Sequence, residues 1–354
     1  MVNKTGLNWT SGHPADFDEV IERSADVLGV WVTGVLCILG VAGNCLSFVV
    51  LQRAFGSSPM FFVLRGLCVS DTAFLASVFV VQTLVNAHAL PVSGLNLSVY
   101  RSRVQYLVWP MLMATQMSTV WLTVLVSGER FVAICYPLLS QVFCTMSNAR
   151  TAVALVTVAS LLFNVPRYFE FSMDMAKTSI GSDPIYRYLY SCVLYCLLLF
   201  VVPLLILLYL NVRLVLALRA GRRRWLHLQV RQRREQTLTN IPLAIVAIFF
   251  ICGTPSLAVN VADSINPDAF GNYNNGIYVV IANLLVVLNS ASNFVVYLFV
   301  GKRFRSQLTE LMTGSCSRCC CCGCSTGCQR NPELRPYQAQ LHLNHTKRYS
   351  STNL

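Results

Sequence analysis

Long runs of apolar residues alternate with short polar segments along most of the chain. Such runs are too long for the core helices of a water-soluble protein, whereas about 20 apolar residues suffice for a helix to cross a bilayer. The pattern therefore predicts an all-α membrane protein, a bundle of seven transmembrane helices. The predicted spans are residues 27–51, 61–85, 104–136, 149–166, 189–218, 238–262 and 276–300, of which the fourth is the shortest.

Composition and charge fit this interpretation and set the orientation of the bundle. Hydrophobic residues make up 55% of the chain and charged residues 12%, which is too apolar for a soluble domain of 354 residues. Arginines crowd the segment after the fifth span and acids the tail at residues 1–26, so the positive-inside rule places the N-terminus outside and the C-terminus inside. The net charge of +12 then reflects basic cytoplasmic loops facing anionic membrane lipid, and it indicates no nucleic-acid partner.

Three Asn-x-Ser/Thr tripeptides lie on the predicted outer side. They make expected glycosylation sites of Asn3, Asn8 and Asn96. No cleavable signal peptide is evident before the first span, so we expect that span to act as the signal anchor.

An acid and an arginine stand side by side at the end of the third span, as Glu129-Arg130. Charged residues are costly in hydrocarbon, so this pair either lies at the membrane face or serves a function. One interpretation is a conformational latch, in which the arginine is held or released. The other is a pair that snorkels to the interface and only anchors the helix end.

Several motifs occur in order between residues 27 and 312. They are Gly43-Asn44, Leu67-x-x-x-Asp71, Glu129-Arg130-Phe131, Pro203, Pro255 and Asn293-x-x-x-Tyr297. Gly301 then opens an amphipathic helix on the membrane surface, residues 301–312, ahead of a cysteine-rich tail at 313–354. This ordered set resembles the rhodopsin-like (class A) G-protein-coupled receptors. Runs at residues 163–167 and 289–294, with Glu170, resemble the invertebrate FMRFamide-type neuropeptide receptors and related vertebrate orphan receptors.

The resemblance implies a plasma-membrane receptor for an Arg-Phe-amide-like neuropeptide. Outward movement of the sixth span would admit a heterotrimeric G protein. The switch residues implied are Glu129, Arg130, Glu235, Pro255, Asn293 and Tyr297, with Glu235 pairing with Arg130 at rest. The alternative for Glu235 is that it neutralises Arg234 at a helix start, where acids are favoured anyway.

The resemblance also implies an allosteric sodium ion in the middle of the bundle. The matching positions are Asp71, Thr119, Asn289, Ser290 and Asn293. All five side chains offer the oxygen ligands that a hard cation prefers. The alternative is a hydrogen-bonded water network with no ion.

Departures from the family pattern are equally specific. Gly253 replaces the usual tryptophan before the span-six proline, Phe294 the proline after Asn293, and Asn211 the usual span-five tyrosine. Most such receptors join span three to the second extracellular loop by a disulfide, but Gln105 stands at the span-three position and residues 167–188 contain no cysteine. We therefore expect no extracellular disulfide, and a loop ordered by packing instead.

Candidate ligand contacts follow from charge and position. Glu170 and Asp263 each closely follow a span end, and either carboxylate would suit a peptide guanidinium, although each is equally a candidate for a solvated loop acid. Leu112, Met113 and Gln116 face the bundle from span three, where pocket lining and core packing are equally good interpretations. Leu112 also stands where amine receptors carry an aspartate, which argues against a monoamine ligand. Span seven has no lysine to form a retinal Schiff base, which argues against a photoreceptor.

The C-terminal tail carries two further patterns. Palmitoylation is favoured over zinc binding for Cys316, Cys319, Cys320, Cys321 and Cys322, because no histidine lies among them and they follow a membrane-surface helix. The chain ends in Ser351-Thr352-Asn353-Leu354, which suits a PDZ domain, and phosphorylation near this end would add charge for a regulator such as arrestin.

Other protein classes fit less well. A seven-span transporter predicts internal repeats and a charge path, and an intramembrane enzyme predicts catalytic motifs, none of which stands out. We therefore expect no enzyme and no cofactor apart from sodium. Within the receptor class, a small aromatic or amino-acid-like ligand is the alternative to a peptide.

Overall fold

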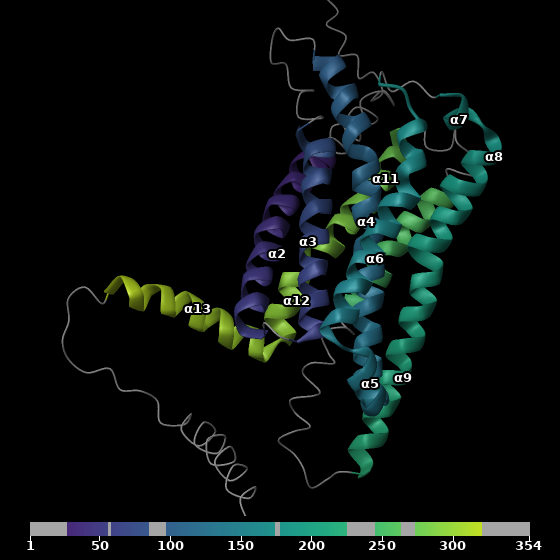
Figure 1. Cartoon of the computed structure of the whole chain (residues 1–354). Coiled ribbons are helices and arrows are strands. Elements are labelled where there is room, and N and C mark those ends of the chain that lie inside the picture. The colour runs from purple at the N-terminus through teal and green to yellow at the C-terminus, as the bar shows by residue number, and fades with distance from the viewer. Residues whose placement is uncertain are drawn as a thin grey trace, which may run out of the picture. The chain divides into compact units, whose positions relative to one another are not determined.

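A computed structural model describes residues 27–55, 58–84, 97–173, 178–224, 245–262 and 273–320. The described residues are predominantly helical, as predicted (Figure 1). The first half of the chain forms η1 (Val27–Val32), α2 (Thr33–Phe55), α3 (Pro59–Val78), η2 (Phe79–Leu84), α4 (Leu97–Cys135) and α5 (Pro137–Phe143). The second half forms α6 (Met146–Asn164), η4 (Val165–Phe169), α7 (Ser179–Ser182), α8 (Pro184–Tyr186), η5 (Arg187–Leu194), η6 (Leu197–Val201), α9 (Val202–Arg224), the helix Ile245–Ala262, α11 (Tyr273–Ala291), α12 (Asn293–Val300) and α13 (Lys302–Cys320).

Six of the helical segments in the described residues are long and apolar enough to cross a membrane. A seventh span arises when Ile277–Ala291 and Asn293–Phe299 are counted as one helix bent by 48°. The chain is thus a multi-pass membrane protein. We call the end of the bundle at Cys135 and Gly301 the inner end, and the opposite end the outer end.

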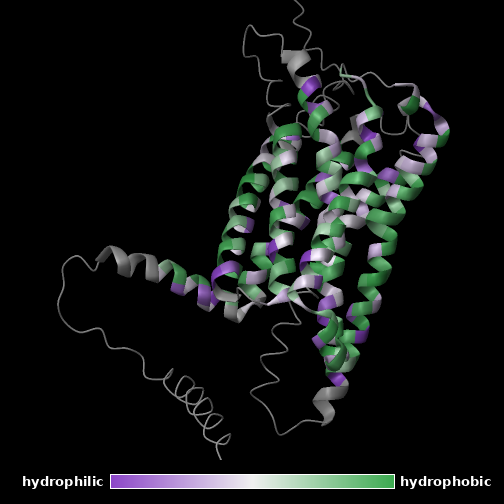
Figure 2. Cartoon of the chain, in the orientation of Figure 1, coloured by the Kyte–Doolittle hydropathy of each residue, from purple (hydrophilic) through white to green (hydrophobic). Residues whose placement is uncertain are grey.

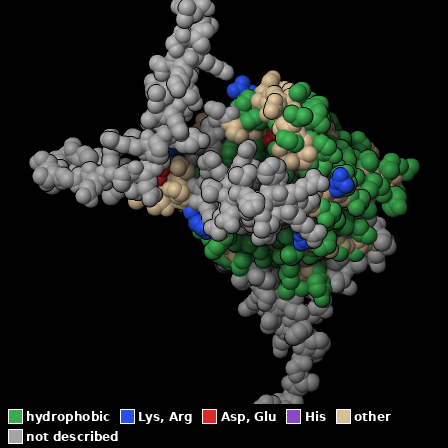
Figure 3. Space-filling model, turned by 90° about the horizontal axis from the view of Figure 1, so that it is seen from below, with side chains coloured by type: hydrophobic (Ala, Val, Ile, Leu, Met, Phe, Trp, Pro, Cys, Tyr) green, Lys and Arg blue, Asp and Glu red, His purple; other side chains and the backbone are tan. Residues whose placement is uncertain are grey.

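The bundle is apolar outside and partly polar inside. Figure 2 shows hydrophobic residues along most of the length of the helices, and Figure 3 shows hydrophobic side chains around the side of the bundle. Leu39, Leu155 and Ile251 are more than 60% exposed, whereas Asn44 and Asp71 are fully buried. This inversion suits a hydrocarbon solvent, in which polar groups must be satisfied within the protein.

The bend in the seventh span occurs at Ser292, although no proline is present there. The hydroxyl of Ser292 donates to the carbonyl of Asn289 at 2.9 Å, and Asn44 Nδ2 on α2 donates to the carbonyl of Ser290 at 3.1 Å. Sharp bends without proline occur where a side chain takes part in the backbone hydrogen bonding of the helix. Both hydrogen bonds use backbone carbonyls at the bend.

The fifth span is irregular in its outer half, where η5 and η6 have π-helical hydrogen bonding. Trp121 on α4 donates its indole N–H to the carbonyl of Leu198 in η6 at 3.0 Å. Short π-helical stretches are frequent at functional sites. This one shapes the wall of the cavities described below.

The helix after the seventh span, α13, packs against the bundle through its first turns. Phe304 is 4% exposed and lies against Tyr297, with ring centroids 5.5 Å apart. Arg305 donates to the carbonyls of Leu298 and Phe299 at 3.0 Å each, which caps the C-terminal end of α12. The helix α13 runs to Cys320, beyond the predicted end at residue 312.

Candidate functional site

Asp71 lies at the centre of the bundle and is fully buried. Its Oδ2 accepts a hydrogen bond of 2.5 Å from Asn293 Nδ2, and the hydroxyls of Ser290 and Thr119 also lie within hydrogen-bonding reach of the carboxyl group. Thr119 Oγ1 donates to Ser70 Oγ at 3.0 Å. Four of the five predicted sodium residues therefore converge, from α3, α4, α11 and α12.

The other carboxylate oxygen of this cluster has no partner among the residues that the structure describes. Asp71 Oδ1 is buried and makes no hydrogen bond, and the same holds for the side-chain oxygens of Asn44 and Ser47 on α2. An unsatisfied buried acceptor is costly, so such atoms call for a cation, a water or a proton. The oxygen donors present here fit a hard monovalent cation.

At the inner end of α4, Glu129 and Arg130 do not form an ion pair. Arg130 is 9% exposed, and its Nε and Glu129 Oε2 are buried without hydrogen-bond partners among the described residues. The physical reason is helix geometry, since adjacent residues point about 100° apart and do not face each other. The arginine is thus buried beside Glu129 without a hydrogen bond between the two side chains among the described residues.

Tyr297 lies between the polar centre and the inner end. It is 2% exposed, packs in a hydrophobic cluster with Leu67 and Val126, and leaves its hydroxyl without a hydrogen-bond partner. A buried phenol normally finds a partner. The hydroxyl therefore needs a water or another polar group to satisfy it.

A cavity of about 480 Å³ lies in the outer half of the bundle. Leu112, Met113 and Gln116, the three predicted contacts on span three, all line it. Arg167 and Arg187 also line it, and no acid is among the described lining residues. Apolar walls with a few polar groups are typical of ligand sites.

Arg167 is the best-connected side chain at this cavity. Its Nε donates to Asn164 Oδ1 at 3.2 Å, and its Nη1 forms an ion pair of 3.4 Å with Glu170. The guanidinium also lies 4.8 Å from the ring centroid of Tyr195 and 5.5 Å from that of Tyr190. Glu170, predicted as a ligand contact, is therefore already paired within the protein. Its partner Arg167 is three positions earlier in the chain, and residues at this spacing lie on the same face of a helical turn.

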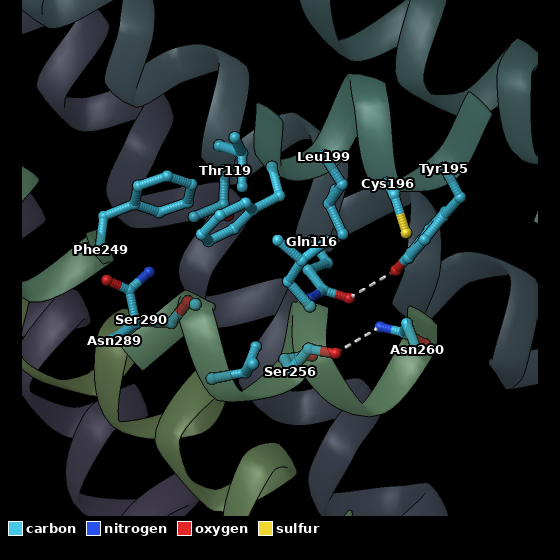
Figure 4. A pocket seen from close by; sticks show the side chains of 15 residues that line it. Gln116, Thr119, Tyr195, Cys196, Leu199, Phe249, Ser256, Asn260, Asn289 and Ser290 are labelled. Carbon is cyan, nitrogen blue, oxygen red and sulfur yellow. Dashed lines mark hydrogen bonds between the residues drawn. The ribbon is translucent and has the colours of Figure 1, made fainter. Parts of the chain in front are cut away.

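A smaller cavity continues from the outer cavity toward the polar centre (Figure 4). Gln116, Ser256 and Asn260 line both cavities, and Thr119, Asn289 and Ser290 line only the inner one. Asn289 is thus placed next to the Asp71 cluster rather than hydrogen-bonded to it. Gln116 Oε1 accepts from Tyr195 at 3.2 Å, as the dashed line in Figure 4 shows.

Gly253 and Phe249 form the wall of this inner cavity on the Ile245–Ala262 helix, near Pro255. Phe249 is 6% exposed and stacks on Phe200 of η6, with centroids 5.9 Å apart. A Cβ at residue 253 would lie 2.7 Å from Phe200 Cε2. An aromatic ring from span five thus occupies the space left by the missing tryptophan.

The loop over the outer end is held by backbone contacts. Thr178 N and Oγ1 donate to the carbonyl of Glu170 at 3.2 Å each. A Cβ at Gly181 would lie 2.1 Å from that same carbonyl oxygen, so only glycine allows this approach. Cys192 is buried and unpaired within the described part of the chain.

Several predicted residues lie outside the described residues: Glu235, Asp263, Asn3, Asn8, Asn96, Cys321 and Cys322. The side chains of Cys316, Cys319 and Cys320 are likewise not described. The sequence analysis did not single out Tyr195, Asn164 or Phe200. Arg167 and Asn164 both belong to the run at 163–167. Polar residues at the end of an apolar segment were the signal that could have identified them as functional candidates.

Comparisons with known proteins agree with this geometry. Residues 43–297 match the family described as 7 transmembrane receptor (rhodopsin family). The chain is 28% identical over 299 residues to an FMRFamide peptide receptor of Caenorhabditis elegans, covering 80% of this chain and 68% of that protein. It is 26% identical over 321 residues to the FMRFamide receptor of Drosophila melanogaster, covering 84% of this chain and 56% of the fly protein. Somatostatin receptor type 4 of Rattus norvegicus is 26% identical over 326 residues, which cover 85% of this chain and 76% of that receptor.

Proposed function

The chain belongs to the rhodopsin family of seven-transmembrane receptors, and from that premise we propose that it binds an extracellular neuropeptide and activates a heterotrimeric G protein. The observation that carries the proposal is the cavity of about 480 Å³ at the outer end, which a smaller cavity extends toward Asp71. The relatives with printed names for FMRFamide peptides favour a peptide that ends in Arg-Phe-amide. We place the receptor in the plasma membrane with its N-terminus outside, because arginines crowd the opposite side of the bundle.

The cavity lining suggests which end of such a peptide enters. An aromatic ring fits among Trp109, Leu112 and Val287, and Arg187 can donate to carbonyl oxygens. The peptide guanidinium would then stay near the mouth, because the described lining holds two arginines and no acid. Asp263 remains the proposed acidic contact there, and Glu170 acts through Arg167.

Signal transmission would use Arg130 and Tyr297, each of which has a buried polar atom without a hydrogen-bond partner among the described residues. Moving the Ile245–Ala262 helix outward opens the inner end and exposes Arg130 to a G-protein helix. Pro255 weakens that helix by removing a backbone hydrogen bond. Glu235 would hold Arg130 in the resting state, and Tyr297 would move with α12. Such a bistable rearrangement is common to switching proteins.

A sodium ion would bind at Asp71, Thr119, Asn289, Ser290 and Asn293 in the resting receptor. Its support is the buried, unpaired Asp71 Oδ1 within a set of oxygen donors. Bound there, the ion would neutralise the carboxylate and link α3, α4 and the seventh span. The residues themselves hold the bundle together without it, through the Asn293–Asp71 hydrogen bond.

The remaining proposals concern the ends of the chain. Glycosylation at Asn3, Asn8 and Asn96, palmitoylation at residues 316–322, a PDZ domain at the C-terminus and arrestin recruitment by a phosphorylated tail are all compatible with this topology. Membrane lipid would surround the apolar outer surface of the bundle.

The test is signalling in cells that express the chain. A panel of amidated neuropeptides is applied while calcium and cyclic AMP are measured. We expect a response to Arg-Phe-amide peptides that Arg130→Ala abolishes and that Gln116→Leu shifts to at least tenfold higher dose, since tenfold corresponds to only about 1.4 kcal/mol. Asp183→Asn, at an exposed acid that lines neither cavity, is the control and should leave the dose response unchanged. Silence toward every peptide at normal surface expression would contradict the proposal.

A further inference from the structure

A second cavity, separate from the ligand cavity, opens on the side of the bundle. Its volume is about 560 Å³, and its walls come from α2, α3, α4 and α6. We call it the lateral groove. It shares one wall residue, Ser70, with the hydrogen-bond network around Asp71, and none with the outer cavity.

The charged groups of the lateral groove lie at its inner end, together with Gln52. Gln52 lies near the end of α2, Arg65 in the second turn of α3 and Arg150 in the first turn of α6. Arg65 is 7% exposed, donates to Gln52 and lies 5.4 Å from the ring centroid of Phe62. Arg150 is exposed. Two cations therefore face one groove near the inner end of the bundle.

The rest of the groove is uncharged and mostly apolar, with a few hydroxyl side chains, and it extends toward the middle of the bundle. Val69, Ala73 and Ala114 line it, and Val153 and Leu161 continue it along α6. From Arg150 to Leu161 the helix rises about 16 Å at 1.5 Å per residue, which is close to half of the roughly 30 Å hydrocarbon core. The groove thus spans one leaflet.

One polar atom lies deep in the groove without a partner. Ser118 on α4 is 4% exposed, lines the groove, and its hydroxyl is buried with no hydrogen bond. An unsatisfied hydroxyl in hydrocarbon is unfavourable. Because this oxygen is itself buried, it is no contact for an occupant of the groove.

We propose that the lateral groove binds an anionic phospholipid of the inner leaflet, with its phosphate between Arg150 and Arg65 and an acyl chain along Val69, Ala73 and Leu161. Charge complementarity selects an anionic headgroup, since each basic residue near the surface attracts anionic lipid by a measurable amount. The groove depth selects a lipid over a soluble phosphate. The site does not depend on the identity of the extracellular ligand.

The experiment uses the full-length receptor in nanodiscs. One set contains phosphatidylcholine alone and the other contains phosphatidylcholine with phosphatidylserine. We expect phosphatidylserine to raise the midpoint of thermal unfolding by mass action. Native mass spectrometry should show retained phosphatidylserine that falls about fivefold in Arg150→Gln, the value of one basic residue. Ala73→Phe, an exposed wall position, should fill the groove and abolish retention.

Arg213→Gln is the matched control, because Arg213 is an exposed arginine on α9 outside the groove. It should retain phosphatidylserine as the unchanged receptor does. Equal retention by Arg150→Gln and the unchanged receptor would overturn the proposal, as would equal retention of phosphatidylcholine. Stabilisation by inorganic phosphate alone would also overturn it. A cooperative thermal unfolding transition of Arg150→Gln and Ala73→Phe in phosphatidylcholine alone shows that these variants fold.

Discussion

Phe200 of η6 lies directly over Gly253 of the Ile245–Ala262 helix. A Cβ at residue 253 would fall 2.7 Å from Phe200 Cε2 and 3.1 Å from Cδ2. Phe200 in turn stacks on Phe249 at 5.9 Å, one turn along the same helix. The ring that contacts the span-six kink is therefore supplied by the neighbouring span.

Gly253→Ala should destabilise the resting receptor. Alanine in a helix gains about 1 kcal/mol over glycine, but overpacking against Phe200 costs about 1–3 kcal/mol, so the clash prevails. In a Phe200→Leu background the clash disappears and the same substitution should become stabilising by up to about 1 kcal/mol. Thermal unfolding of the unchanged receptor, the two single variants and the double variant measures whether the effect of Gly253→Ala on stability changes sign. Equal effects in both backgrounds would show that the two residues do not interact.

Two buried tyrosines offer a matched comparison. Tyr297 has an unpaired hydroxyl, whereas Tyr195 donates to Gln116 at 3.2 Å. Removing an unpaired buried hydroxyl is neutral or stabilising, while removing a paired one costs about 1 kcal/mol. We expect Tyr297→Phe to keep or raise the unfolding midpoint and to reduce agonist-stimulated signalling, and Tyr195→Phe to lower the midpoint. A large loss of stability in Tyr297→Phe would mean that its hydroxyl is bonded at rest.

The sequence predicted a helical membrane protein with several apolar spans, as the structure has it, for a physical reason. A helix in hydrocarbon must be apolar along its whole length, so each span leaves a long run that is visible without tertiary information. The bend at Ser292 leaves no such trace, because it depends on Asn44 of another helix meeting the Ser290 carbonyl. The position of Phe200 over Gly253 is likewise a packing relationship between distant segments.

Parts of the site were within reach of simple geometry. Arg167 and Glu170 are three residues apart and so share a helical face, which allows their pairing to be predicted. Glu129 and Arg130 are adjacent and so point about 100° apart on the helix, which agrees with the missing hydrogen bond between them in the described residues. The convergence of Asp71 with Asn293 instead required the family resemblance, since no local pattern joins residues of different spans.

Asp71→Asn should remove the effect of sodium on stability. For an ion that binds only the folded receptor, a concentration tenfold above its Kd adds about 1.4 kcal/mol to the unfolding free energy. We expect the unchanged receptor to unfold at lower temperature when choline chloride replaces sodium chloride. Asp71→Asn should unfold at the same temperature in both salts, and Asp183→Asn should behave as the unchanged receptor. Sodium dependence that survives in Asp71→Asn would place the ion elsewhere.

The ion pair between Arg167 and Glu170 should couple loop stability to the ligand cavity. The two side chains are 7% and 12% exposed, and Arg167 keeps Asn164 and two tyrosine rings when Glu170 is changed. Glu170→Gln should therefore cost about 1–3 kcal/mol, below the range for a buried charge left with no partner. Arg167→Lys should cost at least as much, because lysine cannot bond Asn164 and Glu170 in the same planar fork.

The double variant separates this pair from its surroundings. If the ion pair is the main interaction of Glu170, the effect of Glu170→Gln should shrink in the Arg167→Lys background, giving a coupling of about 0.5–3 kcal/mol. Both single variants should also shift the peptide dose response in the same direction, because Glu170 acts on the ligand through Arg167 and not by contact. Additive unfolding free energies, together with a dose shift in Glu170→Gln alone, would instead identify Glu170 as a direct ligand contact.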